Sequence, residues 1–203
     1  MYSFDYEKMW EIFTTCLKYI PITVLIAALT LINSIVFGML IAIMRNSAHR
    51  ILRWLSTAYV LMIRGVPILV ILFLVYNLSV RGIDALSVKY GLPFNSATVP
   101  KFWYAVAAFS LCTSAFMGES IRTALLSVPP GQYEAGYSIG MTKFQTMIHI
   151  VLPQALPVAL PIMGNHFINL IKSTAIVSMI GIVDVLNAAL IKVNTSFKYL
   201  EAY

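Results

Sequence analysis

The stretch "EAGYSIGMTKFQTMIHIVLP", residues 134–153, interrupts a strongly apolar chain with two glycines and several polar residues. It follows "PPG" at 129–131, which predicts the end of one helix and the start of another, because proline cannot continue a helix and glycine tolerates unusual dihedral angles. Gly140 lies inside the new helix. We therefore expect two short helices that meet at Gly140.

Apolar side chains recur around this stretch at intervals of three and four residues, which places them on one side of a helix. They are Tyr133, Tyr137, Met141, Phe144, Ile148 and Val151. Small residues between them make the helix thin enough for the backbone of a partner protein to approach. These are Ala135, Gly136, Ser138 and Gly140. The stripe must be buried against lipid headgroups, against its own chain or against another protein. A helix bound to the membrane surface explains the apolar stripe but not the small residues.

The composition indicates that the chain lies in a lipid bilayer. Of its 203 residues, 60% are hydrophobic and 11% are charged, whereas soluble domains have roughly 25% charged residues. Residues 19–44 include no charge, and they exceed the about 20 residues that cross a bilayer as a helix. Further apolar stretches cover 54–80, 102 to about 127, and 150 to about 183. We expect an all-α membrane protein with about four spans.

The distribution of basic residues predicts the orientation. Arg45, Arg50 and Arg53 fall in the short connection after the first span, and the positive-inside rule places such a connection in the cytoplasm. The N-terminus then faces outward and residues 134–153 lie inside. In this orientation the connection 81–101 lies outside the cell. This connection is mildly basic, which argues against the orientation. We keep the assignment because the first basic cluster is denser and closer to its helix ends.

The second and fourth apolar stretches are predicted to be irregular. Arg64, Gly65 and Pro67 disfavour a straight helix, so we expect a helix over 51–63 along the cytoplasmic interface and a span that starts near Gly65. The alternative is a buried, functional Arg64. The prolines at 153, 157 and 161 predict kinks, and residues 173–183 are too few to span, which indicates a broken helix or a re-entrant turn.

Catalytic motifs are missing from the sequence. It has no phosphate-binding loop, zinc-protease motif, nucleophile motif or cluster of histidines and carboxylates. We therefore predict no catalytic residue, no metal site and no cofactor bound by this chain. In a membrane chain the placement of the basic residues matters more than the net charge of +6, so we expect no nucleic acid partner.

The stretch 134–153 resembles the EAA loop of ABC importer permeases, whose pattern is EAA, three residues, G, nine residues and I-x-L-P. This chain has glycine in place of the second alanine, which weakens the helix locally by about 1 kcal/mol. In that family the loop docks into a groove of the cytoplasmic ATPase, which implies a coupling role for the matching residues. These are Glu134, Ala135, Gly136, Gly140, Ile150, Leu152 and Pro153. We expect Glu134 in the first helical turn, where a carboxylate stabilises the N-terminus.

Longer motifs extend the resemblance over most of the chain. "RGVP" at 64–67 is similar to the RGTP of polar amino acid permeases, and two longer stretches resemble motifs of the histidine, glutamine and cystine type. These are "GESIRTALLSVPPGQYEAG", 118–136, and "LPQALPVALPIMGNHFINLIKSTAIVSMIGIVDVL", 152–186. The resemblance implies a MetI-like importer domain over residues 1–203, with a cytoplasmic EAA coupling loop at 128–153, in a bacterial inner or plasma membrane.

The same resemblance implies partners. They are a cytoplasmic ABC ATPase dimer that binds ATP and Mg²⁺, a second copy of the permease or a sister permease, an extracellular substrate-binding protein, and membrane lipid. Permeases of this type usually have five spans, but this sequence stops where the fifth would begin. Either the sequence is truncated or the fifth helix is absent. In both cases we expect four spans, with apolar faces on one flank that the fifth helix would otherwise cover.

Residues 164–174, "GNHFINLIKST", are the candidate substrate path, because broken transporter helices present polar groups near the middle of the membrane. The candidates are Asn165, His166, Asn169, Lys172, Ser173 and Thr174. The alternative is that these side chains only join helices. Glu119 and Arg122, three residues apart, predict a structural ion pair near the cytoplasmic end of the third span.

Two positions bear on the cargo. Leu61 stands where many relatives have an acidic residue, and His166 stands where Glu or Gln is common. A cationic cargo needs a counter-charge in low dielectric, so the loss of these carboxylates argues against Lys, Arg or His as cargo. Cystine or another neutral polar amino acid is therefore expected. Two other classes stay open: a secondary transporter or channel driven by an ion gradient, and a scaffold subunit without a pathway.

Overall fold

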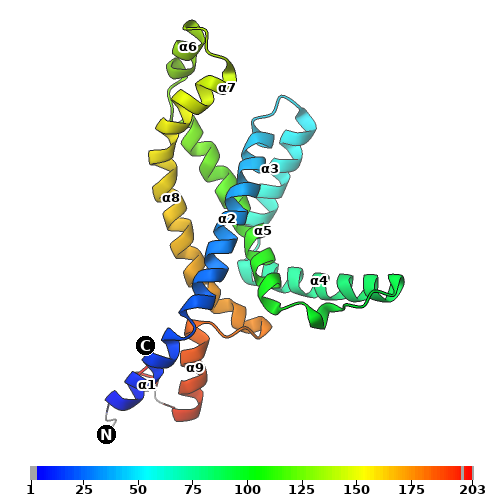
Figure 1. Ribbon diagram of the computed structural model, residues 1–203, viewed down its shortest axis with the longest axis vertical. Coiled ribbons are helices and arrows are strands. Elements are labelled where there is room, and N and C mark those ends of the chain that lie inside the picture. Colours follow the sequence, from blue (N-terminus) through cyan, green and yellow to red (C-terminus); the bar gives the residue numbers. More distant parts are fainter. Residues whose placement is uncertain (1–3, 198, 203) are drawn as a thin grey trace. The chain divides into compact units, whose positions relative to one another are not determined.

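A computed structural model describes residues 4–197 and 199–202, and every regular element in these residues is helical (Figure 1). Elements η1 and η3 are 3-10 helices and η2 is a π-helical turn. In chain order the elements are α1 (Tyr6–Leu17), α2 (Ile20–Arg45), α3 (Arg50–Gly65), α4 (Ile68–Tyr90), η1 (Ser96–Thr98), α5 (Lys101–Leu126), α6 (Pro130–Ser138), α7 (Lys143–Thr146), η2 (Met147–Val151), α8 (Leu152–Ser173), η3 (Thr174–Ile180) and α9 (Val185–Ser196).

The chain forms two compact units. The first unit comprises the described residues of Met1–Thr30, Pro67–Phe109 and Asn169–Tyr203, and the second comprises Leu31–Val66 and Ser110–Ile168. Three of the four boundaries fall within α2, α5 and α8, so each of these long helices contributes to both units, and the fourth lies between α3 and α4.

Three helical runs in the described part of the chain are long and apolar enough to cross a membrane. They are Tyr6–Arg45, Ile68–Tyr90 and Lys143–Ile180. Only 11% of the most apolar window of Ile68–Tyr90 is buried, so its apolar side chains face outward, as they do in a helix surrounded by hydrocarbon. Helix α5 covers the remaining predicted span. The total of four spans stays a prediction.

The predicted break in the second apolar stretch is confirmed. Helix α3 ends at Gly65 and α4 begins at Ile68, and Val66 between them is extended, with φ −105° and ψ 131°. Its extended conformation follows from Pro67, because a proline disfavours the helical conformation in the residue before it. Arg64 lies at the end of α3, where its guanidinium carbon is 5.2 Å from the centre of the Phe116 ring.

The prolines of the last apolar stretch do not end the helix. Helix α8 continues through Pro157 and Pro161 to Ser173. The irregularity precedes them in η2, and Pro153, which follows η2 at the start of α8, has no N–H to donate to the His149 carbonyl. After Ser173 the chain changes to η3 and turns at Gly181, whose φ is 79°. Residues 173–183 are therefore a broken helix.

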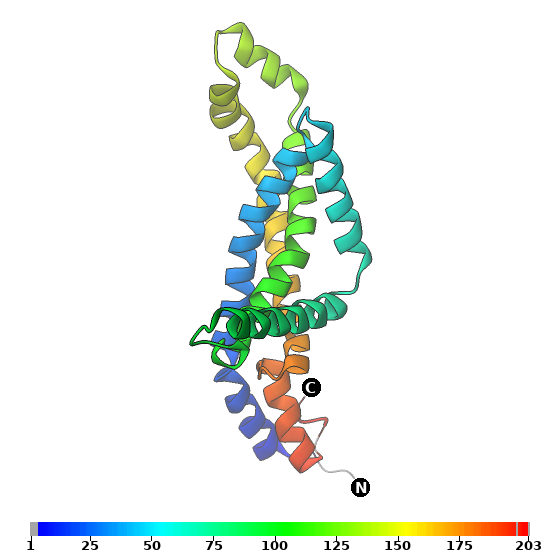
Figure 2. The same ribbon diagram turned by 90° about the vertical axis from the view of Figure 1, so that its right-hand side faces the viewer.

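In the second unit α2, α3 and α5 pack together (Figure 2). Gly38 of α2 and Gly118 of α5 approach so closely that neither has room for a Cβ atom. Helix α3 joins them through Val60, which packs against Ile41 and Ala115. Close contact at small residues is the usual way in which membrane helices associate, because lipid provides no hydrophobic driving force between them.

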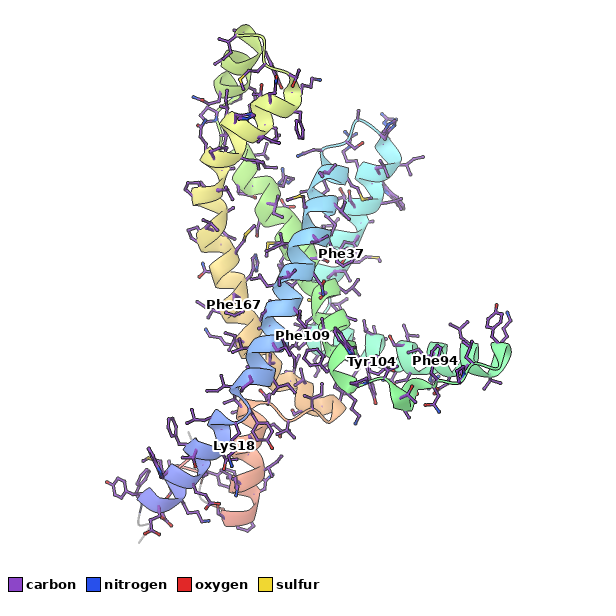
Figure 3. The ribbon with its side chains drawn as sticks, in the orientation of Figure 1. Lys18, Phe37, Phe94, Tyr104, Phe109 and Phe167 are labelled. Carbon is purple, nitrogen blue, oxygen red and sulfur yellow. The ribbon has the colours of Figure 1, made fainter. Side chains whose placement is uncertain are left out.

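In the first unit α9 packs against α1, and α4 lies against η1 and η3. The α1–α9 contact includes Ile12 against Ala189 and Val193, and the Glu11–Lys192 ion pair. Tyr76 of α4 meets Tyr104 of α5 edge to face, with 5.5 Å between ring centres, and Figure 3 labels Tyr104.

Candidate coupling loop and transport residues

The loop between α5 and α8 starts with a helix that proline positions. Pro130 is the first residue of α6, where its fixed φ suits a helix and its missing N–H is not needed. Glu134 consequently lies in the second turn of α6, and the first turn has no acidic residue. The expectation that Glu134 stabilises the helix N-terminus is wrong, because the proline pair starts the helix earlier.

Gly140 separates two short helices, as predicted. Its φ of 82° lies in the left-handed region, which favours glycine. Met141 N donates to the Gly136 carbonyl at 3.1 Å and Gly140 N donates to the Tyr137 carbonyl at 3.0 Å, the paired bonds of a Schellman motif. Thr142 then caps α7 reciprocally with Gln145. The loop is therefore a defined turn between two capped helices.

Gly136 faces α7 and η2, not an outside partner. It is buried, and a Cβ atom added there would lie 2.8 Å from both Cγ2 and Oγ1 of Thr146 and 3.2 Å from Cδ1 of Ile150. The interpretation of Gly136 as a partner-facing small residue is wrong, because the chain folds back after Gly140 and fills this space. Ala135 and Glu134 remain exposed beside it.

The apolar stripe is not buried as one surface. Tyr133 and Val151 pack with Val128 and Ala155, which attaches the loop to the ends of α5 and α8. In contrast, Phe144 is 73% exposed. The chain folds back at Gly140, so the apolar residues before and after it no longer share one surface, and the stripe divides into an anchored part and an exposed part. Of the other coupling residues, Ile150 is half-buried, and Gly140, Leu152 and Pro153 are exposed.

Glu119 of α5 binds two arginines. Its Oε1 accepts from Arg122 Nη2 at 2.5 Å and from Nε at 3.1 Å, so the pair that the spacing predicts is present. Its Oε2 accepts from Arg45 at the end of α2, a partner that sequence spacing does not reveal. The group is partly buried and joins α2 to α5 within the second unit.

The candidate substrate residues divide between the two units. In the second unit His166 Nε2 lies 2.9 Å from Ser120 Oγ, while Asn165 is exposed. In the first unit Asn169 is exposed and its carbonyl accepts from the Ser173 hydroxyl at 2.8 Å. Lys172 and Thr174 differ from the other four because they line a cavity of about 550 Å³.

The cavity of the first unit contains a buried carboxylate that our sequence analysis missed. Asp184 is 2% exposed, lines the cavity with Lys172 and Thr174, and accepts from Asn187 N at 2.9 Å as the N-cap of α9. Thr174 Oγ1 lies 3.4 Å from its other oxygen. An aspartate directly before an apolar helical stretch is a capping signal that could have identified it. The cavity thus offers a carboxylate and an ammonium group.

No group of three or more metal-ligating side chains occurs in the described residues. Apolar helical runs, a two-helix loop held between α5 and α8, and a largely apolar cavity that contains Lys172 and Asp184 are the features of an integral membrane protein, and they fit the transporter class.

Residues 34–202 match the family of binding-protein-dependent transport system inner membrane components. The chain is 39% identical over 188 residues to the L-cystine transport system permease protein TcyB of Bacillus subtilis (strain 168), covering 90% of this chain and 71% of the relative. It is 35% identical over 181 residues to the probable glutamine ABC transporter permease protein GlnM of the same organism, covering 89% and 78%. A crystal structure of an amino acid ABC transporter with histidines aligns with TM-score 0.79 and 31% identity, covering 100% of this chain and 88% of that one. The chain belongs to this family, as a MetI-like ABC transporter permease of the amino acid type.

Proposed function

We propose that this chain is the membrane permease of an ATP-driven importer for polar amino acids, with cystine or another neutral polar amino acid as cargo. The observation that carries the proposal is the loop of α6 and α7. It exposes Ile139 (76%) and Phe144 (73%) although two capped helices and a buried cluster hold it in place. Exposed apolar side chains on a rigid loop favour docking of another protein.

In this proposal the loop transmits movement of an ATPase dimer to the membrane helices. Val128 and Val151 link it to α5 and α8, so a rigid displacement of α6 would tilt both helices. ATP and Mg²⁺ would bind to the ATPase, and this chain would contribute no catalytic residue. A second permease copy or sister permease and an extracellular binding protein would complete an importer in a bacterial cell membrane, with the N-terminus of this chain outside.

Glu134→Lys is expected to leave the permease folded and inserted but to reduce transport per ATP hydrolysed at least about tenfold, because reversing an exposed charge in a docking surface costs several kcal/mol. Uptake and ATP hydrolysis are measured together in proteoliposomes that contain the permease, its ATPase and its binding protein.

Glu7→Lys in α1 is the matched control, since it reverses another exposed carboxylate outside the loop. Normal coupling in Glu134→Lys would remove the loop from the coupling role. Accumulation of substrate by proteoliposomes without any ATPase would favour the secondary transporter.

The cavity of the first unit supports the amino acid part of the proposal. Lys172 suits the carboxylate of an amino acid, and Asp184 and Thr174 suit its ammonium group. A neutral amino acid carries both groups and needs no further counter-charge. The cystine permease among the relatives supports such a cargo.

Lys172→Met and Asp184→Asn are each expected to raise the KM of uptake about tenfold or more, because a hydrogen bond to a charged group contributes roughly 1.5–3 kcal/mol. Asparagine can still cap α9, so Asp184→Asn removes the charge and keeps the helix. Uptake of labelled amino acid is measured against concentration, with ATP hydrolysis in parallel.

Lys18→Met is the control, because Lys18 is an exposed cation in the same unit that does not line the cavity (Figure 3). Unchanged KM values in both cavity variants would exclude the cavity from the substrate path without affecting the coupling loop.

A further inference from the structure

Helix α3 carries an exposed basic surface beside its packed face. Arg50, Arg53, Trp54 and Thr57 follow one another at helical spacing and share one side of α3. With Ile51 they line an open hollow of about 740 Å³, which we call the α3 hollow. The packed face of α3, which includes Ser56 (3% exposed) and Val60 (2%), lies beside this stripe on the helix. Arg50, Arg53 and Trp54 are exposed, so the hollow is open to the surroundings.

The two arginines of the α3 hollow form no ion pair with any described residue. The neighbouring arginines of the second unit are occupied, since Arg45 and Arg122 bind Glu119 and Arg64 lies over Phe116. Two unpaired guanidinium groups one turn apart offer the forked donors that bind a phosphate. A ligand of the α3 hollow should therefore carry a phosphate.

The apolar residues of the same helix indicate a lipid. Trp54 is 69% exposed inside the hollow, and tryptophan is enriched at the headgroup level of membranes. Farther along α3, Leu61 (69% exposed) and Met62 (67%) extend the outward surface as apolar side chains. A soluble phosphate would gain nothing from them, whereas the acyl chains of a lipid would cover them.

We propose that the α3 hollow binds the headgroup of an anionic phospholipid. Arg50 and Arg53 hold the phosphate, Trp54 lies against the headgroup, and the acyl chains follow Leu61 and Met62. By the positive-inside rule this is the cytoplasmic leaflet, which is anionic. The site is independent of the coupling loop and of the cavity of the first unit.

The test uses Trp54 as the only tryptophan of the full chain, after Trp10→Phe and Trp103→Phe. The protein is reconstituted in phosphatidylcholine vesicles with increasing fractions of brominated phosphatidylglycerol, or of brominated phosphatidylcholine as reference, and quenching of Trp54 fluorescence is followed. Half-quenching is expected at an at least tenfold lower fraction of the anionic lipid. Arg50→Gln and Arg53→Gln should each reduce this preference roughly fivefold, because each basic residue near an anionic surface contributes about that factor.

Arg81→Gln, an exposed arginine of α4, is the matched control and should keep the preference. Equal quenching by the two lipids would overturn the proposal. Loss of the preference on addition of millimolar inorganic phosphate would assign the hollow to soluble phosphates instead. If both arginine variants keep the lipid preference but bind the ATPase more weakly, the α3 hollow would instead bind an acidic surface of a protein. Circular dichroism checks that each variant remains folded.

Discussion

Gly38→Val is expected to prevent the second unit from folding. A Cβ atom at Gly38 would lie 2.9 Å from the backbone N of Gly118 and 2.9 Å from Cβ of Met117. These atoms belong to the neighbouring helix itself, so no side chain can rotate to make room. Overpacking a core costs up to about 3 kcal/mol even where neighbours can shift, and valine adds two methyl groups beyond Cβ.

The separation of α2 from α5 would have a second consequence. The Arg45–Glu119 ion pair joins the same two helices, and Glu119 directly follows Gly118, so a wider spacing breaks it. Glu119 then keeps only Arg122, and the arginine of α2 is left without a partner. We expect a severe loss of monodisperse protein and, for any that remains, an apparent Tm in detergent lowered by many degrees.

Gly82→Ala in α4 is the control for Gly38→Val. A Cβ at Gly82 meets nothing within 4 Å, so the change adds helix propensity without a clash and should be neutral or stabilising. Near-normal yield and Tm for Gly38→Val would mean that α2 and α5 do not cross at these glycines.

The sequence predicts the irregular points of the backbone well, because proline and glycine act on their immediate neighbours. Pro67 breaks the second apolar stretch and Gly140 divides the loop, as expected from local chemistry. Pro157 and Pro161 are exceptions, since α8 continues through both. Local signals also found the Glu119–Arg122 pair, which lies within a single helical turn.

Contacts between distant segments could not be predicted from spacing. Arg45 binds Glu119 across 74 positions of sequence, and nothing near either residue indicates this. The sequence interpretation placed Gly136 on a thin, exposed surface. The side of α6 that α7 covers depends on how the chain returns after Gly140, and the spacing of residues does not reveal this return. Lys172 and Thr174 share a cavity with Asp184, whereas Asn165 and His166 lie in the other unit. The coupling and substrate roles of these residues remain proposals.

Gly136→Ala is expected to open the coupling loop and, on the proposed function, to uncouple ATP hydrolysis from transport. The added methyl group would lie 2.8 Å from two atoms of Thr146, a β-branched residue that is fully buried and has little rotamer freedom. Helix α6 must therefore move away from α7 and η2. At a cost of about 1–3 kcal/mol the open form becomes roughly five- to 150-fold more populated. Hydrogen exchange of the loop amides measures the opening, and proteoliposome uptake measures the coupling.

The double variant Gly136→Ala with Thr146→Ala separates this clash from any direct contact of Gly136 with an ATPase. Removing Cγ2 and Oγ1 of Thr146 leaves Cδ1 of Ile150 as the nearest remaining obstacle, and this is the mobile end of a side chain. Both protection of the loop and transport should therefore recover.

Gly131→Ala, where a Cβ meets nothing within 4 Å, should match the unmodified protein. Recovery of loop protection without recovery of transport would mean that Gly136 contacts a partner directly. If the single variant keeps full loop protection, α6 and η2 are not packed together at Gly136.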